Sequence, residues 1–128
     1  MKIAVLIVRS LLGLVFFGFG IAYFLHLLPN KPAPGAAGEF SKGLFLSGYF
    51  FPFLKATETI CGFFLLINKY TALFLLIIFP ITLNIFLFHA FLEPSGVPMG
   101  GVMLLINIFL GYAYRKYYTS IFTASPTV

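Results

Sequence analysis

The sequence predicts an all-α protein, a bundle of four helices that spans a membrane. Of its 128 residues, 61% are hydrophobic and only 9% are charged, whereas a typical soluble domain is about 25% charged. Four stretches are apolar enough to cross a bilayer, which takes about 20 residues each. The composition excludes a water-soluble globule, and it excludes disorder, which requires low hydrophobicity. The length indicates a single domain over residues 1–128.

The first predicted helix covers residues 3–28 and contains one charged residue, Arg9. It is too long for the hydrophobic region of a signal peptide, and it lacks a cleavage site with small residues. We therefore expect this helix to be retained.

A proline-rich connection follows, over residues 29–38 (PNKPAPGAAG). Its prolines and glycines disfavour a regular helix. Residues 40–51 contain an apolar run, and Pro52 suits the first turn of the next helix, where its missing N–H costs nothing. We expect a short interfacial or re-entrant helix over residues 40–51. The alternative is an early start of the second span with a kink at Pro52.

The other three spans are predicted over residues 52–67, 71–91 and 99–118. A tight turn at residues 68–70 joins the second span to the third. A proline-bounded turn at residues 93–98 joins the third to the fourth. Four spans place both termini on the same side of the membrane.

The charges differ between the two sides. One side has four basic residues and no acid, and the other has two of each sign. The positive-inside rule therefore predicts cytoplasmic termini, in the inner membrane if the source is bacterial. The basic residues form no continuous patch, so a nucleic-acid partner is not expected. The basic side carries Lys2, Lys69, Arg115 and Lys116, and the opposite side carries Lys31, Lys42, Glu39 and Glu93.

Polar residues inside the predicted spans are candidate site residues, because such residues are costly in a membrane. Depth can be counted along each helix at about 1.5 Å per residue. Arg9, Glu58 and Asn107 then fall at one level, and Lys55 and Asn84 lie about one turn nearer the outer face. They form either a shared ligand site or a structural Arg9–Glu58 ion pair with asparagine hydrogen bonds. We expect Glu58 within hydrogen-bonding reach of Arg9, although Lys55 could also pair with Glu58 or extend to the interface. The set is Arg9, Lys55, Glu58, Asn84 and Asn107.

The histidines and the single cysteine are further candidates for chemistry. His26, His89 and Glu93 could meet near the outer face as metal ligands, but no HExxH motif supports this, and a metal is not expected. Cys61 is the only cysteine, which excludes an internal disulfide. Its neighbour Gly62 indicates close helix packing, so Cys61 is interpreted as a packing residue.

Short motifs resemble the DoxX family of membrane proteins. The first helix opens with Arg9-Ser-Leu-Leu-Gly13, and the second contains Glu58-Thr-Ile-Cys-Gly62. These are similar to the R-x-x-x-G and E-x-x-x-G motifs of that family. One departure is that Gly20 is followed by Ile-Ala-Tyr-Phe, where many members carry a lysine. The resemblance implies a compact four-helix membrane bundle associated with respiratory or quinone-linked redox systems.

Three functions are open from the sequence. The first is a component of a membrane redox system that binds a quinone, a lipid or a partner subunit around the Arg9–Glu58 site. The second is a small transporter or permeation unit, which would need an oligomer to form a path. The third is a purely structural assembly subunit. The expected partners are the bilayer and either a redox-enzyme subunit or a second copy, and whether the protein is an enzyme is left open.

Overall fold

The computed structural model describes residues 1–29 and 31–128, and all regular secondary structure in this part of the chain is helical. Four helical segments are long and apolar enough to cross a membrane. The predicted all-α membrane bundle is therefore confirmed. In chain order, the elements are α1 (Lys2–Phe24), α2 (Gly35–Leu46), α3 (Phe50–Ile67), α4 (Thr71–Phe91), the 3-10 turn η1 (Pro94–Gly96), α5 (Val97–Ala113) and the 3-10 turn η2 (Arg115–Tyr117).

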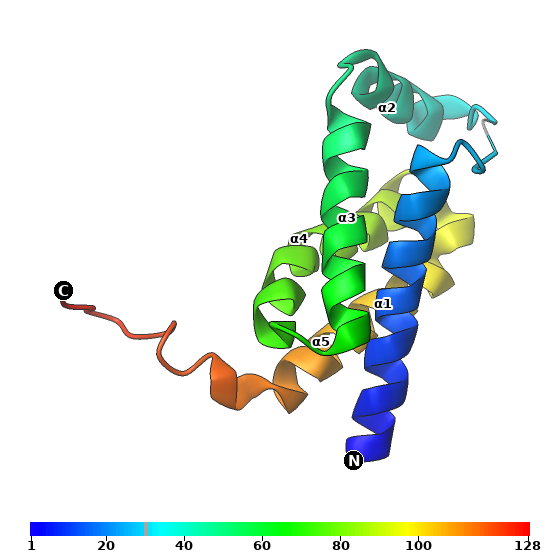
Figure 1. The fold of residues 1–128 in the computed structure, drawn as a ribbon. Coiled ribbons are helices and arrows are strands. Elements are labelled where there is room, and N and C mark those ends of the chain that lie inside the picture. The colour runs from blue at the N-terminus through cyan, green and yellow to red at the C-terminus, as the bar shows by residue number, and fades with distance from the viewer. Residues whose placement is uncertain (30) are drawn as a thin grey trace.

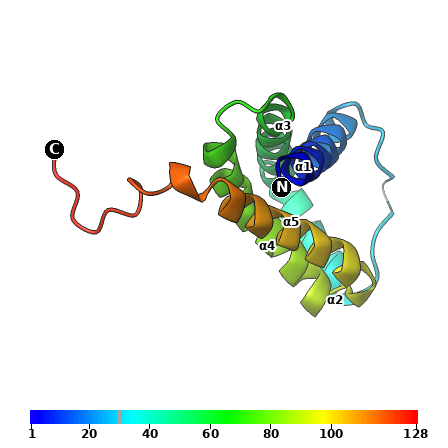
Figure 2. The same cartoon turned by 90° about the horizontal axis from the view of Figure 1, so that it is seen from below.

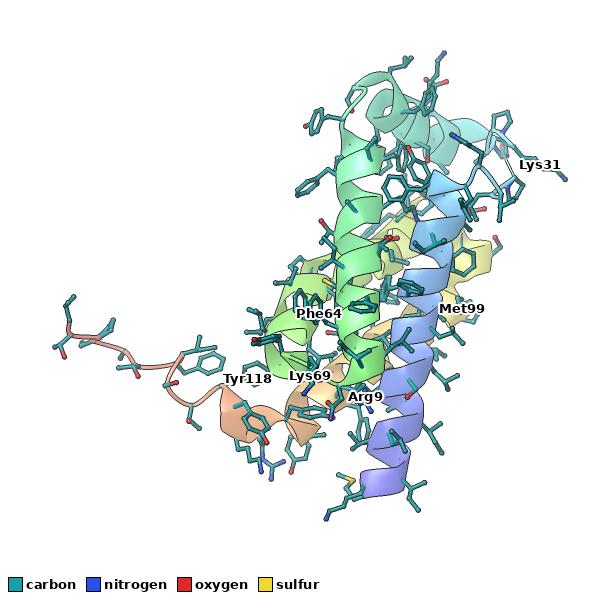
Figure 3. All side chains as sticks on the ribbon, in the orientation of Figure 1. Arg9, Lys31, Phe64, Lys69, Met99 and Tyr118 are labelled. Atoms are coloured by element: carbon teal, nitrogen blue, oxygen red, sulfur yellow. The ribbon has the colours of Figure 1, made fainter. Side chains whose placement is uncertain are left out.

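The spanning helices form two pairs (Figure 1). Helices α1 and α3 lie antiparallel side by side, and α4 and α5 form a second pair that crosses them obliquely. Figure 2 shows the same two pairs from below. The short helix α2 lies across one end of the bundle, which we call the α2 end. The opposite end carries Lys69 (Figure 3) and the pocket-lining residues Lys2, Arg115 and Lys116, and we call it the basic end.

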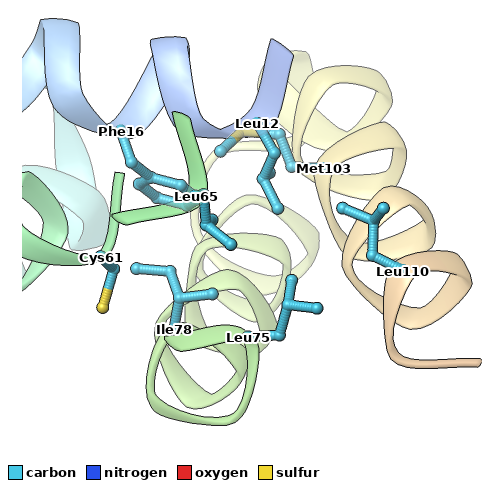
Figure 4. Packing of buried hydrophobic residues seen from close by; sticks show 8 residues of the cluster. All are labelled: Leu12, Phe16, Cys61, Leu65, Leu75, Ile78, Met103 and Leu110. Carbon is cyan, nitrogen blue, oxygen red and sulfur yellow. The ribbon is translucent and has the colours of Figure 1, made fainter. Parts of the chain in front are cut away.

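All four spanning helices contribute to one core (Figure 4). Apolar burial drives packing weakly inside a membrane, so close van der Waals contact between these side chains holds the pairs together. The cluster consists of Leu12, Phe16, Cys61, Leu65, Leu75, Ile78, Met103 and Leu110. Cys61 is only 1% exposed within it, as its interpretation as a packing residue predicted.

Glycines bring the backbones of α1 and α3 into direct contact. A methyl group on Gly62 would lie 2.7 Å from the carbonyl oxygen of Gly13 and 2.9 Å from the Cα of Phe17. A Cβ on Gly20 would collide with the side chain of Thr59. These contacts fix the register of the two antiparallel helices.

Two helix ends use left-handed residues. Helix α1 ends at Phe24, four residues before the predicted end, because His26 has a φ of 58°. The amide of His26 then donates to the carbonyl of Tyr23, and the amide of Leu27 donates to that of Ala22. This is the pattern of a Schellman motif. Asn68, with a φ of 54°, ends α3 in a similar way.

The short helix between the first two spans exists, but its bounds differ from the prediction. It covers Gly35–Leu46 instead of residues 40–51, and α3 begins at Phe50, before Pro52. The three prolines of the connection all precede Gly35, so none of them breaks α2. Pro52 lies in the first turn of α3, where a missing N–H is tolerated.

The last span also ends earlier than predicted. Helix α5 stops at Ala113, five residues before Tyr118. The chain turns there, and Tyr118 is buried against the start of α4, where its hydroxyl donates to the carbonyl of Ala72 at 2.7 Å. The following residues run away from the bundle (Figure 1).

Candidate functional site

Arg9 is buried at the basic end of the bundle, where it caps α3. Its Nη1 donates to the carbonyl oxygens of Leu65 and Leu66, the latter at 3.3 Å. Carbonyls in the last turn of a helix lack intrahelical partners, and this end of the helix dipole is negative. Arg9 therefore satisfies two such groups of α3. Its Nε atom is buried without a partner in the described chain.

Glu58 is buried, 3% exposed, but it does not pair with Arg9. Its Oε2 lies 2.9 Å from the Nζ of Lys55, one turn earlier on α3. The prediction that Arg9 and Glu58 form an ion pair is therefore wrong, and the local alternative with Lys55 is the one observed.

The register of α1 against α3 explains this correction. Because Gly20 faces Thr59, Glu58 lies near the level of Gly20, and that residue is about 16 Å along α1 from Arg9. Helix α1 extends beyond the end of α3 at the basic end, as Figure 1 shows. The depth of Arg9, counted from the start of α1, and the depth of Glu58, counted from the end of α3, therefore cannot be compared directly.

Asn84 does not join the other polar residues. It is exposed on the outside of α4, so it does not line a buried site with Asn107 in a single chain. The five predicted site residues are therefore separated into four places. These are the Arg9 cap, the Lys55–Glu58 pair, the buried Asn107 and the exposed Asn84 on the outside of α4.

Asn107 borders an apolar groove between α4 and α5. The residue is 3% exposed, and its Nδ2 is buried without a hydrogen-bond partner in the described chain. The groove has a volume of about 630 Å³ and is mostly apolar. We call it the α4–α5 groove; its lining includes Leu75, Leu76, Phe79, Asn107, Ile108 and Gly111.

Two residues that were not site candidates from the sequence frame the groove at the basic end. Tyr118 and Arg115 both line it. Burial raises the pKa of the Tyr118 hydroxyl above its ordinary value. The Nη1 of Arg115 donates to the carbonyl of Tyr112 at 2.9 Å, and its guanidinium lies 4.1 Å from the centre of that ring. No motif in this segment of the sequence indicates a groove.

The histidines lie in separate places. The Nδ1 of His89 is 3.7 Å from Glu93 Oε2, one turn later. His26 instead lines a pocket beside Lys55, between α1, α2 and α3. Within residues 1–29 and 31–128, no three side chains of the metal-ligating types come together.

Comparison of the chain with protein-family models, with curated proteins and with solved structures gives no match. The resemblance to the DoxX family thus remains an expectation based on the motifs at Arg9 and Glu58.

Proposed function

We propose that this chain is a small membrane protein that binds a lipophilic ligand with a carbonyl group, of the quinone class, in the α4–α5 groove. The observation that carries the proposal is that Asn107 lines this groove while its buried Nδ2 has no hydrogen-bond partner among the described residues. A ligand carbonyl can accept a hydrogen bond from Nδ2, while the apolar body of the ligand contacts Leu75, Leu76 and Phe79.

The energetics favour such an occupant. A buried polar group without a partner costs about 1–3 kcal/mol. Pockets for small ligands are commonly apolar with a few polar groups that fix orientation. The α4–α5 groove has this character, because its wall is built mainly from apolar side chains and its polar members are few: Asn107, Arg115, Tyr118 and Thr119.

The redox role in this proposal belongs to the ligand. Quinones carry their own electron chemistry, and a protein supplies binding and orientation. We propose that the protein serves as such a binding subunit beside a redox enzyme, as the resemblance to the DoxX family implies. The basic end would face the cytoplasm by the positive-inside rule. Reporter fusions after Val128 and near Gly35 should then give opposite signals.

The transport alternative has less support. It requires Lys55, Glu58, Asn84 and Asn107 along one path, whereas Asn84 lies on the outside of α4. A purely structural subunit is the outcome if no ligand binds.

Ligand binding can be tested in nanodiscs with decylubiquinone as the probe. The chain has seven tyrosines and no tryptophan, so its intrinsic fluorescence comes from tyrosine, and Tyr118 lies at the groove. Bound quinone should quench this signal in a saturable way. Asn107→Leu should weaken binding about fivefold, which corresponds to the loss of one hydrogen bond of about 1 kcal/mol.

Thr57→Val is the matched control, since it removes a polar side chain of a spanning helix that does not line the groove. Its affinity should equal that of the native protein. Equal affinities for native protein and Asn107→Leu, or quenching that never saturates, would contradict the proposed site.

A further inference from the structure

We propose that a second pocket, at the basic end, binds the phosphate headgroup of an anionic phospholipid. This headgroup pocket lies between the start of α1 and the chain that follows α5, and it has a volume of about 580 Å³. It is distinct from the α4–α5 groove, although Arg115 borders both. The proposal does not depend on quinone binding.

The charge of the headgroup pocket is entirely positive. Lys2, Arg9, Arg115 and Lys116 line it, and no acidic residue does. The whole chain contains only three acidic residues. Of these, Glu58 is paired with Lys55. The other two, Glu39 and Glu93, lie in α2 and after α4, away from this end. The protein itself therefore supplies no carboxylate to neutralise the pocket.

Arg9 gives the pocket a buried donor. The residue is 6% exposed, and its Nε has no partner within the described part of the chain, while its Nη1 is occupied by the carbonyls of α3. A guanidinium stays charged in proteins and matches the geometry of phosphate oxygens. Charge-assisted hydrogen bonds to phosphate are among the strong ones. A phosphate group would thus satisfy both the charge and the free donor of Arg9.

The position of the pocket favours a lipid over free phosphate. The pocket lies at the ends of α1 and α5, where the headgroups of a bilayer leaflet lie. Val5 and Leu6 of α1 form part of its wall, and Leu6 is 53% exposed. The acyl chains of a phospholipid can therefore continue along the apolar face of α1, whereas inorganic phosphate makes no such contact. Basic pockets between transmembrane helices are known to suit lipid headgroups.

The test measures thermal unfolding of purified protein in detergent during titration with phosphatidylglycerol, phosphatidylcholine or inorganic phosphate. Phosphatidylglycerol should raise the unfolding temperature at low lipid-to-protein ratios, and the other two should not. Equal effects of the two lipids would overturn the headgroup specificity. An equal effect of inorganic phosphate would overturn the lipid as the source.

Variants then locate the site. Lys2 and Lys116 are both exposed, so their replacement by glutamine should leave the fold intact. Each substitution should weaken binding of phosphatidylglycerol about fivefold, and the double variant about 25-fold. Lys69→Gln is the matched control, because Lys69 lies at the same end and does not line the pocket. Binding by the double variant that equals binding by Lys69→Gln would refute the assignment.

A second and independent observation concerns α4. We infer that its outer face joins a second copy of this chain. Six exposed residues follow one another at alternating spacings of four and three positions, which is the spacing of a helix–helix seam. Asn84 lies within this seam and is exposed in the single chain. The seam consists of Leu73, Ile77, Pro80, Asn84, Leu87 and Phe91.

Asn84 indicates that the partner at this seam is a second copy of the chain. It lies seven residues before the end of α4, or about 11 Å inside the span. An amide in hydrocarbon needs a partner. It also carries both a donor and an acceptor, so two copies related by a two-fold axis can pair the same residue with itself. Lipid tails offer no such partner.

Cysteine crosslinking in membranes tests this interface in a Cys61→Ala background. Leu87→Cys should form a disulfide-linked dimer upon oxidation, whereas Ile108→Cys, exposed on α5, should not. Adding Asn84→Leu to Leu87→Cys should strongly reduce the crosslinked fraction. An absent Leu87 crosslink, or one that Asn84→Leu leaves unchanged, would overturn the inference.

Discussion

The contact between α1 and α3 predicts that Gly62→Ala destabilises the bundle. The new methyl group would lie within 3 Å of three backbone atoms, on Phe17 and Gly13. Backbone atoms cannot rotate aside as a side chain can, so the two helices must separate. Overpacking of this kind costs about 1–3 kcal/mol.

The higher helix propensity of alanine offsets part of this overpacking cost. Alanine is favoured over glycine within a helix by about 1 kcal/mol. With three backbone clashes we expect the upper part of the overpacking range, and hence a net loss of about 2 kcal/mol. Gly18→Ala on α1 is the matched control, since a Cβ there meets nothing within 4 Å. That variant should be as stable as the native protein, or slightly more stable.

Cys61 offers an assay for this comparison. It is the only cysteine and is 1% exposed in the core between the helices. A fluorogenic thiol reagent should label it only when the bundle opens, so the labelling curve in a titration of mixed micelles with dodecyl sulfate reports unfolding. Gly62→Ala should shift this curve to lower dodecyl sulfate, and Gly18→Ala should not. A Gly62→Ala curve that coincides with the native one would refute the close backbone contact.

Three further predictions follow from the site geometry. Arg9→Gln should lower the free energy of unfolding by about 2 kcal/mol, because it removes charged hydrogen bonds to α3. In a double-mutant cycle the effects of Arg9→Gln and Glu58→Gln should add, since the two residues are far apart. A coupling energy above about 1 kcal/mol would show that the two residues pair after all. The raised pKa of Tyr118 lies above its unfolded value of 10.0, so its contribution to stability should be full below that pH and be lost as the pH rises through the folded value. Absorbance at 295 nm should show one late-titrating tyrosine that disappears in Tyr118→Phe, and an unchanged titration would contradict this. Cys61→Ala should fold and retain quinone binding, measured by tyrosine quenching, because a lone buried thiol acts as a small apolar side chain; lost binding with an intact fold would indicate thiol chemistry.

The fold was largely predictable from the sequence, because apolar length decides which segments can span a membrane. All four spans and the short intervening helix were predicted. The predicted helix ends were less accurate where a residue adopts a conformation that is unusual for its type. His26 takes the left-handed position that glycine usually fills, and Tyr118 leaves the helix to bond with the carbonyl of Ala72. Neither choice is visible in hydrophobic patterning.

The candidate site was less predictable, because its geometry depends on helix register. The burial of Arg9, Glu58 and Asn107 followed from their positions within apolar spans. Their partners did not, since Gly13 and Gly62 set the offset between α1 and α3. The rotation of α4, which leaves Asn84 outside, depends on packing against α3 and α5. A helix with apolar residues on all sides gives no periodic signal for its buried face.

In the proposed complex, Asn107 Nδ2 donates a hydrogen bond to a ligand carbonyl in the α4–α5 groove. Infrared spectroscopy of quinone with ¹³C-labelled carbonyls, bound to the native protein and to Asn107→Leu, measures this bond directly. A hydrogen bond lowers the stretching frequency of the carbonyl that accepts it. The native complex should show a lowered carbonyl band that returns to the frequency of lipid-dissolved quinone in Asn107→Leu. Identical bands in the two proteins would contradict it.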